Sequence, residues 1–326
     1  MMQRRHFLAA TGAVAMVSAR PVRAAWPDRP VRMIVPFAAG GNTDVVARIL
    51  QQRLQEKFAQ PFVVENRPGA GGSLGGEAVA RARPDGYTLL VGSNGPLSVN
   101  PVVQARMPYD SQRDFAPIGL IMQVPHCLVV QPNAPFQNLA DIITASRAQA
   151  DALGVGTAGV ASATHLALES FKVQSGARLL HVPYRGAGAA LPDFLAGNLP
   201  MLFTELSTAL QIANERKGRI IAVASTARLP ALPDVPTIIE GGFPGFTAAS
   251  YVGLLAPAGT PQDVMRPLSE ALLAITAEAS FRQRMGALGG EAAGPNEATP
   301  AGFAELIRAD IARSRRAAEA ANIKAE

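Results

Sequence analysis

The sequence predicts an α/β protein of two lobes, and three observations support this prediction. The chain has 326 residues, which is enough for two domains that each bury their own core. Apolar, β-branched runs alternate with segments of helical periodicity, and this alternation restarts near residue 124. Because 48% of the residues are hydrophobic and only 17% are charged, an intrinsically disordered chain is excluded.

The first series of elements has the order strand, helix, strand, helix, strand. The expected strands are 31–37, 62–65 and 87–91, and the expected helices are 43–58 and a short helix that opens at the glycine loop 69–76 and ends near Arg83. One face of helix 43–58 carries Val46, Ile49, Leu50 and Leu54. Strands joined through helices have right-handed crossovers, so these three strands are expected to form a parallel sheet.

The second series repeats this alternation. The expected strands are 127–130, 154–157, 179–182, 200–204, 220–224 and 251–255, and the expected helices are 139–148, 164–173, 187–196 and 207–214. Long Ala-rich helices are expected to begin at Pro261 and Pro300. Proline-rich segments mark the connections between these elements.

The first 24 residues are predicted to be an export signal. Arg4 and Arg5 form a charged start, residues 7–19 form a short apolar stretch, and Ala24 ends a cleavage motif. The apolar stretch is too short to span a bilayer. The paired arginines also fit a twin-arginine signal, so the secretory and twin-arginine routes both remain open. The sequence therefore predicts an exported chain that is cleaved near Ala24.

Cleavage at this point would remove most of the excess of basic over acidic residues in the chain. The full sequence has 30 Lys and Arg against 25 Asp and Glu, and the predicted signal holds four of the arginines and no acid. The mature chain would keep 26 basic and 25 acidic residues. It has no run of cations that could follow a phosphate backbone, so nucleic acid is not an expected partner.

The mature chain lacks the common patterns of catalytic and metal-binding side chains. Its three histidines, His126, His165 and His181, show no paired metal-ligand spacing. His165 and Glu169 lie one helical turn apart, and we interpret them as a polar pair on a helix. Cys127 lies in an apolar strand, where it is expected to be a buried hydrophobic residue.

The glycine loops also lack the pattern of a nucleotide site. Loops 69–74 and 186–191 both carry Leu where a dinucleotide-binding loop requires Gly or Ala, and no Walker motif is present. We therefore expect no catalytic residue, no metal, no cofactor and no enzymatic activity.

Three loops bring Gly and small hydroxyl residues to the start of a helix. They are 39–43, 92–95 and 156–162. At a helix start, free N–H groups and the positive end of the helix dipole attract a carboxylate. The carboxyl ends of parallel strands are also where ligands usually bind. Asn42, Thr43 and Ser162 could alternatively do no more than cap their helices.

Seven motifs, in order along the chain, resemble those of one family. They are 26–44 (WPDRPVRMIVPFAAGGNTD), 64–72, 84–90, 114–118, 181–186, 232–237 and 255–261. Together they are similar to the substrate-binding proteins of the tripartite tricarboxylate transporters, the Bug (Bordetella uptake gene) family. The resemblance covers essentially the whole mature chain.

The resemblance implies a periplasmic, type II-like Venus flytrap protein, with a ligand cleft between two parallel-rich sheets. It implies that backbone amides, small hydroxyls and water hold a small carboxylate. Carried over by position, the implied ligand contacts in the first lobe are Phe37, Ala39, Gly41, Asn42, Thr43, Ser93 and Asn94. In the second lobe they are Thr157, Gly159, Ser162, Thr164, His165, Tyr184, Arg185 and Thr204.

Two positions depart from the family pattern. Ala161 stands where the family commonly has a second Gly, and Thr204 stands where it often has Asp. Without that carboxylate, a partner for an amino group is lost. We therefore expect the ligand to be a carboxylate without an ammonium group, such as a dicarboxylate or an aromatic acid.

The resemblance also implies a domain division and partners. Residues 1–24 would be the signal peptide, 25–123 and 250–326 the first lobe, and 124–249 the second. The protein, expected to be a monomer, would deliver its solute to membrane transporter subunits after the lobes close around it. An exported α/β enzyme that acts on a small acid, or a ligand sensor for a membrane regulator, are the alternatives.

Overall fold

The computed structural model describes residues 26–184 and 186–323, so the predicted export signal lies outside the described residues. The strands pair in the order β2-β1-β3-β9-β4-β7-β5-β6, and β10 and β8 also pair with β4. The strands of the first lobe are β1 (Val31–Val35), β2 (Phe62–Asn66), β3 (Thr88–Ser93) and β10 (Glu291–Ala292). Those of the second lobe are β5 (Gly154–Thr157), β6 (Leu180–Pro183), β7 (Met201–Glu205) and β8 (Arg219–Val223).

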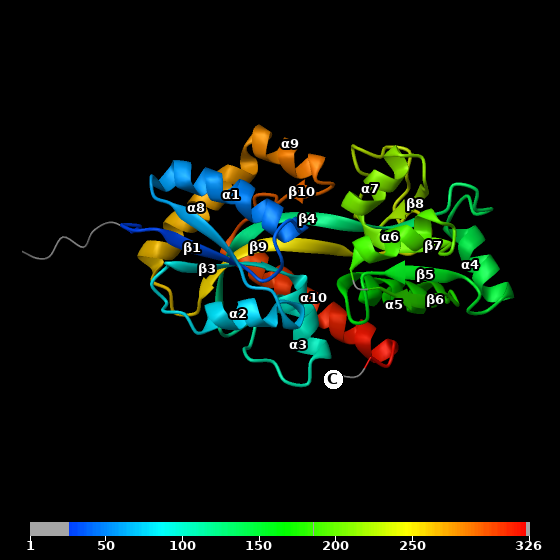
Figure 1. The fold of residues 1–326 in the computed structure, drawn as a ribbon, viewed down its shortest axis with the longest axis horizontal. Coiled ribbons are helices and arrows are strands. Elements are labelled where there is room, and N and C mark those ends of the chain that lie inside the picture. Colours follow the sequence, from blue (N-terminus) through cyan, green and yellow to red (C-terminus); the bar gives the residue numbers. More distant parts are fainter. Residues whose placement is uncertain (1–25, 185, 324–326) are drawn as a thin grey trace, which may run out of the picture.

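Two long strands, β4 (Phe115–Val130) and β9 (Ala249–Pro257), join the lobes (Figure 1). The first part of β4 pairs antiparallel with β9, from Phe115 opposite Pro257 to Pro125 opposite Ala249. The last five residues of β4 pair with β7 and β8 of the second lobe. The segments 118–123 and 248–254, which lie at the expected boundaries between the lobes, are therefore almost entirely within paired strands.

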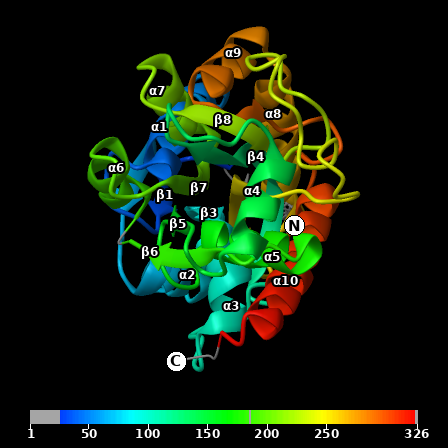
Figure 2. The same cartoon turned by 90° about the vertical axis from the view of Figure 1, so that its right-hand side faces the viewer.

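Helices cover both lobes (Figure 1). The helical segments of the first lobe are α1 (Asn42–Phe58), η1 (Ala70–Gly72), α2 (Ser73–Ala80), η2 (Gly95–Val99), α3 (Asn100–Val103), α8 (Gln262–Ala277), α9 (Ala279–Ala287) and α10 (Pro300–Ala320). Those of the second lobe are α4 (Leu139–Ala148), α5 (Ala163–Ser175), α6 (Ala187–Leu195) and α7 (Leu206–Asn214). Helix α10 packs against β4 and also reaches α5, so it spans the junction (Figure 2).

The predicted apolar face of α1 is buried. Val46, Leu50 and Leu54 are fully buried against β1 and α8 side chains, and Ile49 is nearly so. Burial of one such side chain stabilises the fold by roughly 1.5–3 kcal/mol. The second lobe has a core of its own around Phe171 and Phe203. The parallel pairing of β1 with β2 and β3 is confirmed.

Two parts of the fold differ from the sequence-based expectation. Strand β4 begins twelve residues before the expected 127, because bulges near Gly119 and Leu120 let the chain continue through Pro117 and Pro125. A side chain at position 119 would lie 2.3 Å from the carbonyl oxygen of Ala298, so this position requires Gly. The expectation that loop 92–95 leads into a helix is confirmed, but the helical range 95–103 was not predicted, since Gly and two Pro usually indicate a loop.

Candidate functional site: a cleft between the lobes

A cleft of about 1700 Å³ lies between the lobes. Its walls are formed by the segments that follow β1 and β3 in the first lobe and β5, β6 and β7 in the second. These are carboxyl ends of strands, where ligands bind in open α/β sheets. The volume exceeds the roughly 300–1000 Å³ of a typical small-molecule site. The cleft therefore has room for a small-molecule solute.

The loop before α1 is shaped by the buried carboxylate of Asp44. Its Oδ2 accepts hydrogen bonds from the Gly40 N–H at 2.9 Å and from Arg48 Nε at 3.0 Å. Its Oδ1 accepts a hydrogen bond from Asn66 Nδ2 at 2.9 Å. Burial raises the pKa of this carboxyl, but the bonds from Arg48, Gly40 and Asn66 outweigh burial and lower the pKa to about 2. The charged Asp44 side chain therefore fixes the conformation of the loop before α1 at the edge of the cleft.

Asn42 and Thr43 do not cap α1. The residue before the helix is Gly41, and no side chain caps this end. The N–H groups of the first helical residues thus have no acceptor within the helix. Asn42 and Thr43 line the cleft, so an anion placed there would meet unpaired N–H donors and the positive end of α1.

The loop before α5 lines the opposite wall. Ser162 caps α5, because its Oγ accepts a hydrogen bond from the His165 N–H at 3.1 Å. Thr164 Oγ1 accepts from the Ala158 N–H at 3.0 Å. The alternative that Ser162 is a cap is therefore confirmed. Both side chains also line the cleft, so capping does not remove them from reach of a solute.

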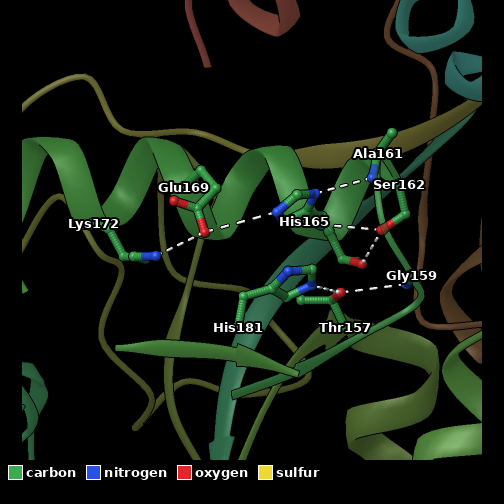
Figure 3. A network of polar contacts seen from close by, with 9 residues as sticks. Thr157, Gly159, Ala161, Ser162, His165, Glu169, Lys172 and His181 are labelled. Atoms are coloured by element: carbon green, nitrogen blue, oxygen red, sulfur yellow. Dashed lines mark hydrogen bonds and ion pairs between the residues drawn. The ribbon is translucent and has the colours of Figure 1, made fainter. Parts of the chain in front are cut away.

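Two stacked histidines support this loop from behind (Figure 3). His165 Nδ1 accepts a hydrogen bond from the Ala161 N–H at 3.0 Å. His181 Nε2 lies 2.7 Å from Thr157 Oγ1, which also accepts from the Gly159 N–H at 3.3 Å. Burial lowers the pKa of both imidazoles to about 4, so both are neutral at pH 7. An acceptor role for His165 Nδ1 requires this neutral form.

The expected polar pair of His165 and Glu169 is present but is buried. Glu169 Oε1 lies 3.8 Å from His165 Nε2 and 2.9 Å from Lys172 Nζ (Figure 3). Within residues 26–184 and 186–323, no group of three or more His, Cys, Asp or Glu could hold a metal ion. Cys127 is fully buried, and burial raises the pKa of its thiol.

The structure places eight of the implied contact residues along the cleft. Those of the first lobe are Phe37, Gly41, Asn42, Thr43, Ser93 and Asn94, and those of the second are Ser162 and Thr164. Six others lie outside the lining. Ala39 is exposed on its loop, and Thr157 and Gly159 are buried within the loop before α5. His165 lies behind that loop, Tyr184 donates to Asp193, and Thr204 is buried. Arg185 lies outside the described residues.

Several cleft residues were missed by the sequence reasoning. They are Glu205, Ser207 and Thr208 at the start of α7, and Ser250 and Tyr251 on β9. Side chains alternate across a strand, so when Thr204 points into the core, Glu205 points to the other side. The available signal was the position of Glu205 at the end of a strand, directly before a helix.

Known proteins that are similar to this chain belong to one family of transport receptors. The family model for the receptors of the tripartite tricarboxylate transporter family matches residues 46–323. The chain belongs to this family. Protein BugT of Bordetella pertussis (strain Tohama I) is 36% identical to this receptor over 271 residues, which are 82% of each chain. The family resemblance of the motifs is thus confirmed.

Solved structures agree with this assignment. Rpa4515 from R. palustris, solved with adipate, has a TM-score of 0.81 and 33% identity over 92% of this receptor and 100% of that chain. MatC from Rhodopseudomonas palustris, solved with bound malate, has a TM-score of 0.76 and 31% identity over 90% and 99%. The receptor is therefore a solute-binding protein of the two-lobed α/β class, as the sequence predicted.

Proposed function

We propose that this receptor is exported to the periplasm, captures a small carboxylated solute in its cleft, and delivers it to the membrane subunits of a tripartite tricarboxylate transporter. The observation that carries the proposal is the pair of helix starts, α1 and α5, on opposite walls of one cleft. Each offers N–H or hydroxyl groups suited to a carboxylate. The similarity to proteins solved with adipate and malate supports the same ligand class.

The charge of the cleft supports recognition by amides rather than by an ion pair. Among the described residues, the side chains that line the cleft include no Lys or Arg. A carboxylate would therefore be held by backbone N–H groups near Asn42 and Thr43 and by the hydroxyls of Ser93, Ser162 and Thr164. Such neutral donors bind an anion without the desolvation of a buried cation.

Closure would require rotation about the strands that join the lobes. We place the first lobe at 25–123 and 250–326 and the second at 124–249, with bending near 118–123 and 248–254. The bulges in β4 near Gly119 and Leu120 fall in this region. A solute that contacts both walls would stabilise the closed state by its additional contacts there.

As regards the membrane, no helix in residues 26–184 or 186–323 is both long and apolar enough to cross it.

The proposal is tested by adding mono-, di- and tricarboxylates to the purified protein and measuring thermal unfolding and heats of binding. At least one acid should raise the melting temperature in proportion to the logarithm of its concentration, and it should be recovered unchanged. A panel that produces no shift and no heat would contradict carboxylate capture, and conversion of the acid would indicate an enzyme. Fractionation of cells with and without residues 1–24 tests export.

A further inference from the structure

Glu205 has a fixed position in the cleft where the two lobes join. It is the last residue of β7 and the residue before α7, and its side chain lines the cleft. Ser250 of β9 donates a hydrogen bond from Oγ to Glu205 Oε1 at 2.5 Å. His126 of β4 contacts the same Ser250 Oγ through Nε2 at 3.1 Å. Three strands therefore hold this carboxyl group in place.

The direction of these hydrogen bonds leaves one carboxyl oxygen for a solute. His126 Nδ1 is buried without a partner, and an unpaired acceptor occurs more readily in a protein interior than an unpaired N–H. His126 Nε2–H therefore donates to Ser250, and Ser250 donates to Glu205 Oε1. Burial lowers the pKa of His126 to about 3, so His126 brings no positive charge. The remaining oxygen of Glu205, Oε2, is the one available in the cleft.

The surroundings of Glu205 favour its neutral form. Burial raises the pKa of its carboxyl, and the hydrogen bond from Ser250 only partly opposes this. The titratable groups on the packed elements are His126 and Cys127 on β4, Tyr251 on β9, and Asp310 and Arg313 on α10, next to His126. The salt bridges among the described residues supply no cation to Glu205. The N-terminus of α7 favours the charged form and therefore opposes the effect of burial.

We propose that Glu205 is a specificity-determining residue. In its neutral, protonated form, Glu205 donates a hydrogen bond from Oε2–H to the second carboxylate of a bound dicarboxylate. This inference rests on the proposed function, in which the first carboxylate binds at the α1 and α5 loops. A hydrogen bond from an acid to a carboxylate is short and strong, and the proton stays on Glu205. A solute with an ammonium group at this position would lose that bond.

The test compares the wild type with Glu205→Gln, which keeps a donor but cannot ionise. Glu270→Gln, on the exposed side of α8, is the matched control. Calorimetry from pH 5 to pH 9 uses succinate, malate and adipate against aspartate and glutamate. Wild type and Glu270→Gln should prefer the dicarboxylates, and their affinity should fall as pH rises, by up to about tenfold per pH unit. Glu205→Gln should bind dicarboxylates within about threefold of wild type near pH 6 and, above that pH, where both carboxylates of the solute are ionised, lose the pH dependence.

A second measurement is independent of any solute. Carbon-13 titration of the glutamate carboxyls, with the Glu205 signal assigned by its loss in Glu205→Gln, should give Glu205 a midpoint above the roughly 4.3 of a free glutamate side chain. A midpoint at or below that value would overturn the inference, as would a preference for aspartate or glutamate that Glu205→Gln abolishes. If no acid binds, the proposed function fails, and the titration still decides the state of Glu205.

Discussion

His165 and His181 stack face to face, with ring centroids 3.8 Å apart and ring planes 12° apart. His165 belongs to α5 and His181 to β6, and each ring bonds a different part of the loop from Thr157 to Ser162. Two adjacent imidazolium rings would repel each other, and a protonated His165 Nδ1 could not accept the Ala161 N–H. The shape of this cleft wall therefore depends on neutral histidines.

Acidification should destabilise the protein through this pair. The pKa of both rings is about 4 in the folded chain and about 6.5 in the unfolded chain, so the unfolded chain binds more protons between these values. The contribution of this pair to the free energy of unfolding is then fully present above pH 6.5 and falls as pH drops toward 4. Urea unfolding from pH 4 to 8 should show a shallower fall in His181→Gln than in wild type. Equal slopes would show that the pair does not govern acid stability.

Asp44 should stabilise both the fold and the binding loop. Asp44→Ala leaves the Gly40 N–H without its acceptor and removes one of the two acceptors of Asn66 Nδ2, which keeps its bond to the Phe37 carbonyl oxygen. The expected loss is about 1–3 kcal/mol in the free energy of unfolding. Solute affinity should fall as well, because the loop at the start of α1 loses the hydrogen bonds that fix its conformation. Glu305→Ala, which removes an exposed ion pair with Arg308, is the control and should cost under about 1 kcal/mol. A loss for Asp44→Ala no larger than the control would contradict this role.

Ala161 has a left-handed backbone, with φ of 57°. A side chain in this conformation costs roughly 1–2 kcal/mol, which a glycine avoids. Because glycine also gains freedom in the unfolded chain, Ala161→Gly should raise the free energy of unfolding by at most about 1 kcal/mol. Ala304→Gly, at an exposed position within α10, should lower it by about 1 kcal/mol. Denaturant unfolding of both variants checks the opposite signs.

Local patterns predicted much of the fold. Helix α1 was predicted to within one residue because its apolar positions repeat with helical period, and α4 and β5 match the expected ranges. The continuity of β4 could not be read from the sequence, since Gly119 and the flanking prolines normally interrupt a strand.

The candidate site was predicted less completely. The glycine-rich loops indicated the edge of the sheet at the carboxyl ends of the strands, where the cleft lies. This was possible because helix starts and strand ends are local features of the sequence. The stacking of His165 on His181 and the contact of Ser250 with Glu205 join residues from distant segments. The sequence did not show whether Thr204 or its neighbour Glu205 points into the cleft. That depends on which face of the sheet each side chain of the strand lies on, and a shift of one residue reverses the two faces.

The central claim is that the α1 and α5 loops hold a solute's carboxylate. Ser162→Asp and Ser162→Asn test this claim directly, because both residues cap helices well and only Asp adds a negative charge. At an effective dielectric constant near 20, two charges about 4 Å apart repel by roughly 4 kcal/mol. Both variants should melt close to wild type, since the cap that bonds the His165 N–H is retained.

The deciding measurement is the calorimetric affinity of these two variants for the acid that binds wild type most tightly. We expect Ser162→Asn to bind within about tenfold of wild type and Ser162→Asp to lose at least a further tenfold. Equal affinities for the two variants would contradict the account, because the carboxylate would then bind away from Ser162.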